Sequence, residues 1–297
     1  MRPRQISSVT VMALLVLFAV TGCSSNKNRP VPPPLMGHIA FYSNRAAPDR
    51  DDIYVIAANG TGLIKLTSTR QRNWFPAYSP NATFIAFQGE NGEQFGDIFR
   101  IPPSGGGETL LTPNTPRNDD IEPAVSPDNT RIAFSSDRNG NPNIYTMNAS
   151  DGSDVRQLTT DAGADVEPAY TPDGHIVYLA KRDSGSGFFI MNADGSNQQR
   201  LTTSTAIDEF PAVSPSGDRI AFDSNRNGDF QIFTMRLDGS DVRQFSNVLG
   251  MHPTYSPDGQ WIAFSSNGNI VALPVHGGAL VHITVGTSTD LAPSWGR

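Results

Sequence analysis

The sequence has only one cysteine among its 297 residues, Cys23, so no disulfide can form within the chain. Without a cysteine pair or a His-Glu-x-x-His motif, it lacks the usual patterns of zinc ligation. It also lacks a Gly-x-Ser-x-Gly elbow, a P-loop and a dinucleotide-binding glycine pattern. We therefore expect no cofactor, no metal site and no catalytic residue of these kinds.

Positive charge is scarce relative to negative charge, with 22 Lys and Arg against 29 Asp and Glu and a formal net charge of −7. Recognition of nucleic acid through its phosphates needs clustered basic residues, so we expect no nucleic-acid partner. The loop Asp137–Asn143 places oxygen-bearing side chains at alternating positions, but it lacks the bidentate Glu that completes a calcium loop.

Only one long apolar run is present, Val9–Val20, and it is shorter than the ~20 residues that a membrane-spanning helix needs. It follows two arginines and precedes Val20-Thr21-Gly22-Cys23, which resembles the lipobox of bacterial lipoproteins. The resemblance implies a signal peptide over 1–22, a lipidated Cys23 and a Pro-rich tether over 23–37. Ser24 favours the periplasmic face of the outer membrane. An ordinary signal peptide or an uncleaved anchor is the alternative.

The remainder of the chain, 38–297, consists of repeats of about 43 residues. Each repeat opens on a proline, and these prolines are Pro76, Pro123, Pro168, Pro211, Pro253 and Pro293. A Pro-Ala-aromatic stretch, an Ile-Ala-Phe stretch, an Ile-Tyr-x-Met stretch and a Leu-Thr stretch then follow as four candidate strands. Turn signals such as Ser256-Pro257-Asp258-Gly259 and Asp151-Gly152 separate them.

Four strands per repeat of this length predict an all-β propeller with four-stranded blades. The first repeat lacks its first strand, and the last, Pro293-Ser294-Trp295, has only that strand. Pairing the two would give six blades and a closed ring without exposed sheet edges.

The repeat resembles the propeller of the TolB family, whose pattern combines Ser-Pro-Asp-Gly, Ile-Ala-Phe, Ser-Asp/Asn-Arg and a later Asp-Gly turn before Leu-Thr. Residues 120–159 carry this pattern almost throughout, including Ser136-Asp137-Arg138. The resemblance implies a six-bladed propeller over 38–297, and propellers of this kind occur both in the Tol envelope system and beside enzyme domains. Unlike TolB, this sequence shows only the tether before the propeller, and it has a lipobox.

The segments that precede the blade prolines form the candidate site, because in a propeller they meet at one mouth of the central channel. We expect an acidic and aromatic recognition surface there, formed by Glu122, Glu167, Glu209, Trp74, Phe75, Phe210 and His252. The repeated aspartates of the same segments are expected to hydrogen-bond their own turns and serve the structure: Asp120, Asp165, Asp208 and Asp290.

Two functions are compatible with these residues. The first is a monomeric, lipid-anchored binding or scaffold protein of the cell envelope that engages a protein or peptide at the channel mouth. The alternative is a carbohydrate lyase or hydrolase that uses channel residues such as His252 with Asp120 or Glu122. A purely structural spacer is a third possibility.

Overall fold

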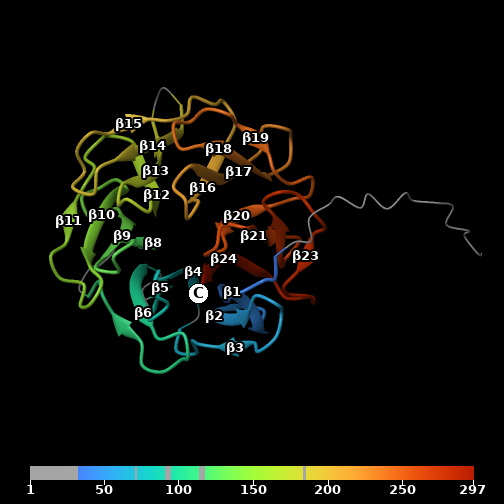
Figure 1. Cartoon of the computed structure of the whole chain (residues 1–297). Coiled ribbons are helices and arrows are strands. Elements are labelled where there is room, and N and C mark those ends of the chain that lie inside the picture. Colours follow the sequence, from blue (N-terminus) through green and yellow to red (C-terminus); the bar gives the residue numbers. More distant parts are fainter. Residues whose placement is uncertain (1–32, 71, 91–94, 114–117, 183–184) are drawn as a thin grey trace, which may run out of the picture. The chain divides into compact units, whose positions relative to one another are not determined.

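The computed structural model describes residues 33–70, 72–90, 95–113, 118–182 and 185–297, and these residues form six four-stranded antiparallel sheets around one axis (Figure 1). The predicted six-bladed propeller is therefore confirmed. The predicted signal peptide and Cys23 lie outside the described residues. No helix occurs in the described part of the chain, and hence none that could cross a membrane.

We number the blades from the one that joins the two ends of the propeller. Blade 1 contains β24 (Asp290–Gly296), β1 (His38–Ala47), β2 (Arg50–Ala57) and β3 (Ile64–Lys65). Blade 2 contains β4 (Asn73–Tyr78), β5 (Ile85–Glu90), β6 (Gly96–Ile101) and β7 (Thr109–Leu110). Blade 3 contains β8 (Asp120–Val125), β9 (Arg131–Ser136), β10 (Asn143–Asn148) and β11 (Arg156–Gln157).

The other three blades repeat this order. Blade 4 contains β12 (Ala164–Tyr170), β13 (Ile176–Lys181), β14 (Gly187–Met191) and β15 (Gln199–Arg200). Blade 5 contains β16 (Asp208–Val213), β17 (Arg219–Ser224), β18 (Gln231–Arg236) and β19 (Arg243–Gln244). Blade 6 contains β20 (Met251–Tyr255), β21 (Trp261–Ser266), β22 (Asn269–Pro274) and β23 (Val281–His282). The first strand of each set lies innermost, around the channel.

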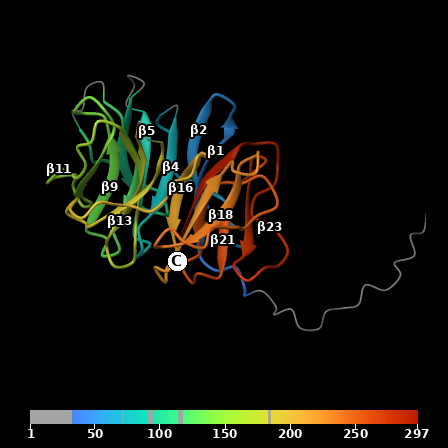
Figure 2. The same ribbon diagram turned by 90° about the horizontal axis from the view of Figure 1, so that it is seen from above.

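Ring closure occurs as the repeat predicts. In blade 1, Ile39 of β1 pairs with Trp295 of β24, and Ser43 pairs with Asp290. The Trp295 indole Nε1 donates a hydrogen bond of 2.7 Å to the carbonyl of Met36. The first and last strands of the propeller therefore complete one sheet, and both ends lie on the same face (Figure 2).

The hydrophobic core lies between the blades. The aromatic side chain of each Ile-Ala-Phe strand is fully buried, and these residues are Phe41, Phe87, Phe134, Tyr178, Phe222 and Phe264. One core cluster joins Ala86 and Ile98 of blade 2 to Ile132 and Phe134 of blade 3. Because each sheet is covered on both faces by its neighbours, its central strands are apolar on both sides rather than alternating.

The Leu-Thr stretch lies just beyond the fourth strand, which consists of the two residues before it. Its threonine hydroxyl accepts the backbone N–H of the third strand, as Thr67 does from Ile53 (2.9 Å) and Thr159 from Ile144 (3.0 Å). Ser246 occupies the same position in blade 5 and accepts from Ile232 at 3.0 Å. The side-chain hydroxyl thus takes the place of the next backbone acceptor in the β-ladder, which explains why the outer strand is so short.

Candidate functional site

The central channel narrows where the residue before each blade proline adopts a left-handed backbone. These residues have φ between 46° and 56° and are Phe75, Glu122, Glu167, Phe210, His252 and Ala292. Such a conformation costs about 1–3 kcal/mol for a residue other than glycine, so the surrounding structure must hold it in place. The strand register shifts at this point, as between Ile121 and Ala124. The bulge turns the side chains inward, and with their prolines they line a cavity of 130 Å³.

Several backbone N–H groups at these bulges are satisfied by side chains of the preceding blade. The N–H of Glu167 donates to Glu122 Oε2 (2.9 Å), and the N–H of Phe210 donates to Glu167 Oε2 (2.6 Å). Further around the ring, the N–H of His252 donates to Asp223 Oδ1 at 3.3 Å. The channel side chains therefore join successive blades as well as lining the cavity.

Aromatic rings fill one part of the channel. Phe75 and Phe210, from the opposite blades 2 and 5, stack with ring centroids 5.7 Å apart. The imidazole of His252 packs edge-on against Phe210 at 4.2 Å and against Phe75 at 5.8 Å. Burial lowers the pKa of His252 to about 4, and its Nδ1 has no hydrogen-bond partner among the described residues. His252 is therefore neutral near pH 7 and behaves as part of an aromatic plug.

Carboxyl groups occupy the rest of the constriction. Burial raises the pKa of Glu122, and burial together with the neighbouring Glu122 carboxyl raises the pKa of Glu167 well above its usual value. Burial likewise raises the pKa of Asp223 well above the usual value. In each case burial shifts the equilibrium toward the protonated form, because the charged carboxylate loses its hydration.

The structure brings together five of the seven residues expected at the recognition surface: Phe75, Glu122, Glu167, Phe210 and His252. The other two lie one position earlier on their strands and point elsewhere. The Trp74 indole Nε1 donates to Asp51 Oδ2 at 2.8 Å, and Glu209 lies 3.9 Å from the Lys181 ammonium near the channel rim. Their position in the repeat explains why they do not face the channel. Glu209 stands two residues before its blade proline, as Ile121 does, whereas Glu122 stands one residue before.

Asp223 is a channel residue that the sequence analysis did not identify. It stands in an Ile-Ala-Phe-Asp-Ser stretch where blades 3 and 6 have Ser135 and Ser265. Those serines play the same structural role, since Ser265 Oγ accepts the N–H of Ala292 at 3.0 Å. The sequence feature that could have identified Asp223 is a carboxylate at a repeat position where blades 3 and 6 carry a serine.

The four repeated aspartates are buried and pair with arginines, and of the four Asp290 also accepts a hydrogen bond of 3.3 Å within its own turn, from the Ser288 hydroxyl. The guanidinium groups of Arg45, Arg138, Arg182 and Arg226 contact Asp290, Asp120, Asp165 and Asp208 at 2.6, 2.8, 2.6 and 2.9 Å. Arg138, Arg182 and Arg226 belong to the polar loop after the Ile-Ala-Phe strand, and Arg45 lies in the last part of β1. The Arg226 guanidinium also lies 5.3 Å from the Phe222 ring centroid, which places the cation over an aromatic face.

The loop Asp137–Asn143 shows ordinary turn chemistry in the structure. Asp137 Oδ1 accepts the N–H of Asp119 at 2.8 Å, and the Asn143 side-chain amide donates to the carbonyl of Asn141 at 2.9 Å. Within the described ranges, no group of three or more His, Cys, Asp or Glu residues could hold a metal ion.

Sequence comparison identifies the family of this propeller. A family profile described as the TolB beta propeller domain matches residues 117–187 and 176–297. The chain therefore belongs to the TolB β-propeller family.

Two proteins resemble this chain in sequence. A TolB homologue of Chlorobium luteolum is 34% identical over 211 residues, which cover 68% of this chain and 45% of the relative. An uncharacterised protein of Agrobacterium fabrum is 31% identical over 148 residues, covering 50% of this chain and 49% of that protein. The chain thus spans about half the length of the curated relatives it matches.

Solved structures agree on the fold. TolB from Acinetobacter baumannii superposes with a TM-score of 0.77 at 22% identity, over 90% of this chain and 68% of that one. A putative TolB from Agrobacterium tumefaciens gives a TM-score of 0.68 at 21% identity, over 89% of this chain and 92% of that one. At these identities the similarity is one of fold.

Proposed function

We propose that this protein is a lipid-anchored binding or scaffold protein of the bacterial cell envelope, and that it engages a protein or peptide at the channel mouth. The mouth is the face at which the innermost strands begin. The closed channel is the observation that carries this proposal. Because Phe75, Phe210 and His252 meet across the axis directly below the mouth, a partner would rest on the rim and fill only a shallow recess.

The rim offers the contacts that protein interfaces use. Ile207, Leu249 and Met251 stand at or just before the starts of β16 and β20 and are 49%, 44% and 38% exposed. Glu209 and Lys181 line one pocket together with Ile207 and are partly exposed charges. Apolar anchors next to charged groups are typical of a protein-binding surface, while the five residues of the recess would receive a side chain of the partner.

The proposed anchor would leave this rim accessible. The described chain begins at the face opposite the mouth, where Gly37 and Met36 contact the end of β24. The segment that follows the proposed lipidated Cys23 therefore enters the propeller at the face opposite the mouth. Membership of the TolB propeller family supports a place in the envelope, and periplasmic exposure at the outer membrane is part of the proposal.

Site-specific photo-cross-linking in the native host tests the binding face. A photoreactive amino acid at Met251 should form adducts with an envelope protein. The same amino acid at Asp258, in the Ser-Pro turn of the same blade on the opposite face, is the matched control and should give none. Adducts at position 258 alone would place the partner on the other face.

The anchor is tested separately. Cys23→Ala should release the protein from membranes or leave an uncleaved precursor, because only a thiol can receive the diacylglycerol. Mass spectrometry of the wild-type mature protein should find a lipid-modified Cys23, and an unmodified residue there would remove the anchor from the proposal.

A further inference from the structure

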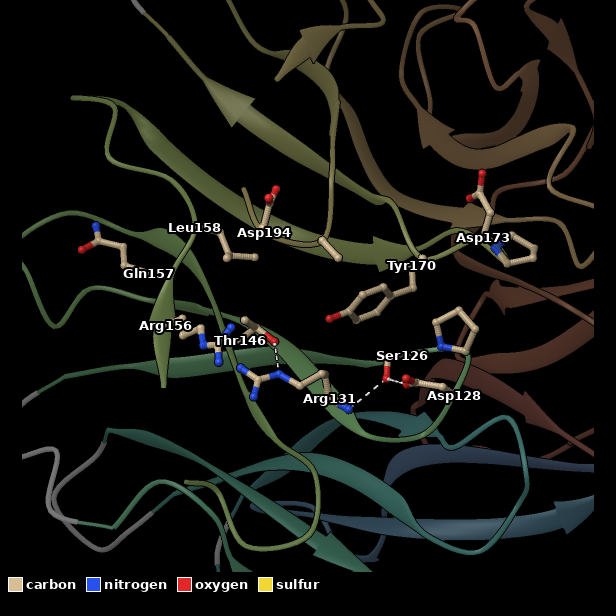
Figure 3. A pocket seen from close by; sticks show the side chains of 14 residues that line it. Ser126, Asp128, Arg131, Thr146, Arg156, Gln157, Leu158, Tyr170, Asp173 and Asp194 are labelled. Carbon is tan, nitrogen blue, oxygen red and sulfur yellow. Dashed lines mark hydrogen bonds between the residues drawn. The ribbon is translucent and has the colours of Figure 1, made fainter. Parts of the chain in front are cut away.

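A groove of 640 Å³ lies between blades 3 and 4, on the side of the Ser-Pro turns and away from the channel mouth (Figure 3). Blade 3 contributes residues 126–128, Arg131 and residues 156–158, and blade 4 contributes Tyr170, residues 172–174 and Asp194. Its volume is in the range of about 300–1,000 Å³ that ligand sites usually have.

The groove exists because one turn is a residue shorter than its equivalents. In blades 2, 3, 5 and 6, a backbone hydrogen bond closes the turn after the innermost strand, and its acceptor lies five residues after its donor. In blade 3 this bond runs from Ser126 N to the carbonyl of Arg131. In blade 4 the bond runs from Thr171 N to the carbonyl of His175, only four residues away. The sequence shows the same deletion, with Thr-Pro-Asp-Gly-His where blade 5 has Ser-Pro-Ser-Gly-Asp-Arg.

The longer turns of other blades contact the preceding blade. A Cβ on Gly217 of blade 5 would lie 3.4 Å from Pro172, and Asn129 Oδ1 of blade 3 accepts the N–H of Asn81 at 2.9 Å. In blade 4, by contrast, no atom of the described chain lies within 4 Å of the position where Gly174 would carry its Cβ. The shortened turn therefore leaves a gap in front of Pro127.

The floor of this gap is largely apolar. Tyr170 lies near the middle of the groove in Figure 3 and packs against the core cluster that contains Leu158. Pro127 and Pro172 also line the groove. At its outer end the groove is closed by the next turn of blade 4, because Gly195 packs on the backbone of Leu158. An apolar side chain of moderate size would find a matching surface on Tyr170.

Three carboxylates stand around the floor: Asp128, Asp173 and Asp194. Each accepts turn hydrogen bonds, such as those from the Ser196 N–H (3.0 Å) and hydroxyl (2.6 Å) to Asp194 Oδ1. Such bonds lower the pKa of all three, so all three are ionised at neutral pH. In Asp194 only Oδ1 takes part, which leaves Oδ2 for a ligand.

The two arginines of the groove do not offset this charge fully. Arg131 Nη1 and Arg156 Nη2 both contact Asp154 Oδ2, at 2.9 and 2.7 Å. Arg131 also contacts the Asn148 side chain at 2.7 Å. Both guanidinium groups thus share an aspartate. Of the three groove carboxylates, Asp173 also has the His175 imidazole Nδ1 at 3.1 Å, so the carboxylates still outnumber the cations that reach them and a cationic ligand is favoured over an anionic one.

We propose that the groove between blades 3 and 4 is a second binding site of this propeller, which takes an extended peptide segment carrying a basic side chain next to an apolar one. The apolar side chain rests on Tyr170 and Leu158, and the basic group meets Asp173 and Asp194. This site is independent of the channel mouth, so its failure would leave the proposed function untouched.

The probe is the capped tripeptide acetyl-Lys-Phe-Lys-amide, titrated into the isotope-labelled propeller and followed by amide NMR shifts. We expect saturable shifts at residues 126–131 and 171–175. Acetyl-Lys-Ser-Lys-amide, which lacks the apolar group, should bind at least tenfold more weakly. The absence of shifts in the groove would overturn the proposal. Tighter binding of acetyl-Glu-Phe-Glu-amide would also overturn it, because the arginines would then define an anion site.

Two sets of variants locate the site. Asp194→Asn keeps the oxygen that accepts from Ser196 and should weaken binding severalfold, whereas Asp238→Asn changes the equivalent turn of blade 5 and should have no effect. Replacing residues 172–174 with the four residues 215–218 restores the full turn and should abolish binding at unchanged melting temperature. Wild-type affinity in a folded protein with the restored turn would place the peptide elsewhere.

Discussion

A buried aspartate stands three residues before the blade proline only in those blades that supply an arginine four residues after the aromatic residue of the next strand. Blades 1, 3, 4 and 5 have both partners, as in Asp208 with Arg226. Blade 6 has neither, since glycines stand at both positions, Gly250 and Gly268. Blade 2 carries Asn73, and there Arg70 covers the Phe99 ring at 3.6 Å from a different loop. In the other five blades the aspartate and the arginine are either both present or both absent, as expected if the aspartate serves to hold the arginine.

Removing one partner of this ion pair should lower the free energy of unfolding more than removing both. Arg226 contacts both carboxylate oxygens of Asp208 at 2.9 Å. Arg226→Ala would leave a buried carboxylate alone, and a loss of about 3–5 kcal/mol is expected. The double variant Asp208→Asn with Arg226→Ala should recover part of that loss. Urea unfolding of both variants measures the difference, and equal stabilities would show that the ion pair is incidental.

His252 should make the protein sensitive to acid. Its pKa is about 4 in the folded protein and near 6.5 when unfolded, so between these values the unfolded chain binds a proton that the folded one does not. Stability contributed by the neutral imidazole is therefore lost as pH falls from 6.5 to 4. His252→Phe should flatten this part of the pH profile of the melting temperature. Phe75 and Phe210 show that a phenylalanine fits this backbone conformation.

Glu167 should act in the opposite direction. Its pKa is raised well above 4.5, so above pH 4.5 the unfolded chain releases a proton that the folded protein retains. Its contribution to stability therefore falls as pH rises through that window. Glu167→Gln keeps an oxygen to accept from the Phe210 N–H and should gain stability relative to wild type as pH increases from 5 to 8. A constant difference across this range would show that Glu167 titrates normally.

At this scale the sequence predicted which segments meet at the channel, because the blade prolines mark one phase of the repeat. It did not predict which residue of each segment faces the axis. That choice depends on a left-handed bulge at the residue before the proline, and neither Glu122 nor Phe75 belongs to a residue type that favours it. The arginine partners were missed because three of them follow their aspartates by 17 or 18 residues, while Arg45 lies at the other end of the chain from Asp290, and only the sheet brings each pair together.

Among the elements, the Asp-Gly hairpin turns fix the distance between blades. The hairpin at Gly152 rests on the outer edge of blade 2, so closely that a Cβ there would lie 1.9 Å from the carbonyl oxygen of Leu111. Gly239 approaches Leu201 of blade 4 in the same way, at 2.1 Å. Glycine is therefore required at these turns by close approach as well as by backbone conformation.

A matched pair of substitutions separates these two requirements. Gly152 and Gly62 have similar φ values, 74° and 69°, but a Cβ added to Gly62 would meet no described atom within 4 Å. Gly62→Ala should cost only the strain of a left-handed alanine, roughly 1–2 kcal/mol. Gly152→Ala should cost about 1–3 kcal/mol more, since the blades must separate. Thermal unfolding of the two variants measures this, and equal costs would remove close approach as the cause.

The strands themselves were predictable because repeated turn signals divide the chain into short apolar stretches. The exception is the fourth strand, which was placed on Leu-Thr and lies before it. A threonine hydroxyl that accepts a backbone N–H ends the ladder there, as at Thr67. A side chain that substitutes for a backbone partner cannot be recognised from strand propensity.

For the whole molecule, stability depends on closing the ring. Deleting residues 292–297 would remove Trp295, which is 7% exposed, and the part of β24 that pairs with His38–Ala40 of β1. Loss of the buried indole alone should lower the free energy of unfolding by about 1.5–3 kcal/mol. The open sheet edge can also pair with strands of other molecules. We expect a large fall in melting temperature together with aggregation, seen by light scattering. Deleting only Arg297, which is exposed, is the control and should change little.

The shared blade also has a consequence for how such a module can be moved between proteins. His38 and Gly296 are paired neighbours on adjacent strands, so the propeller begins and ends at one point of its circumference. A ring built in this way can be inserted into a surface loop of another protein without stretching either junction. It can equally be circularly permuted, with the old ends joined by a short linker and new ends opened at another blade.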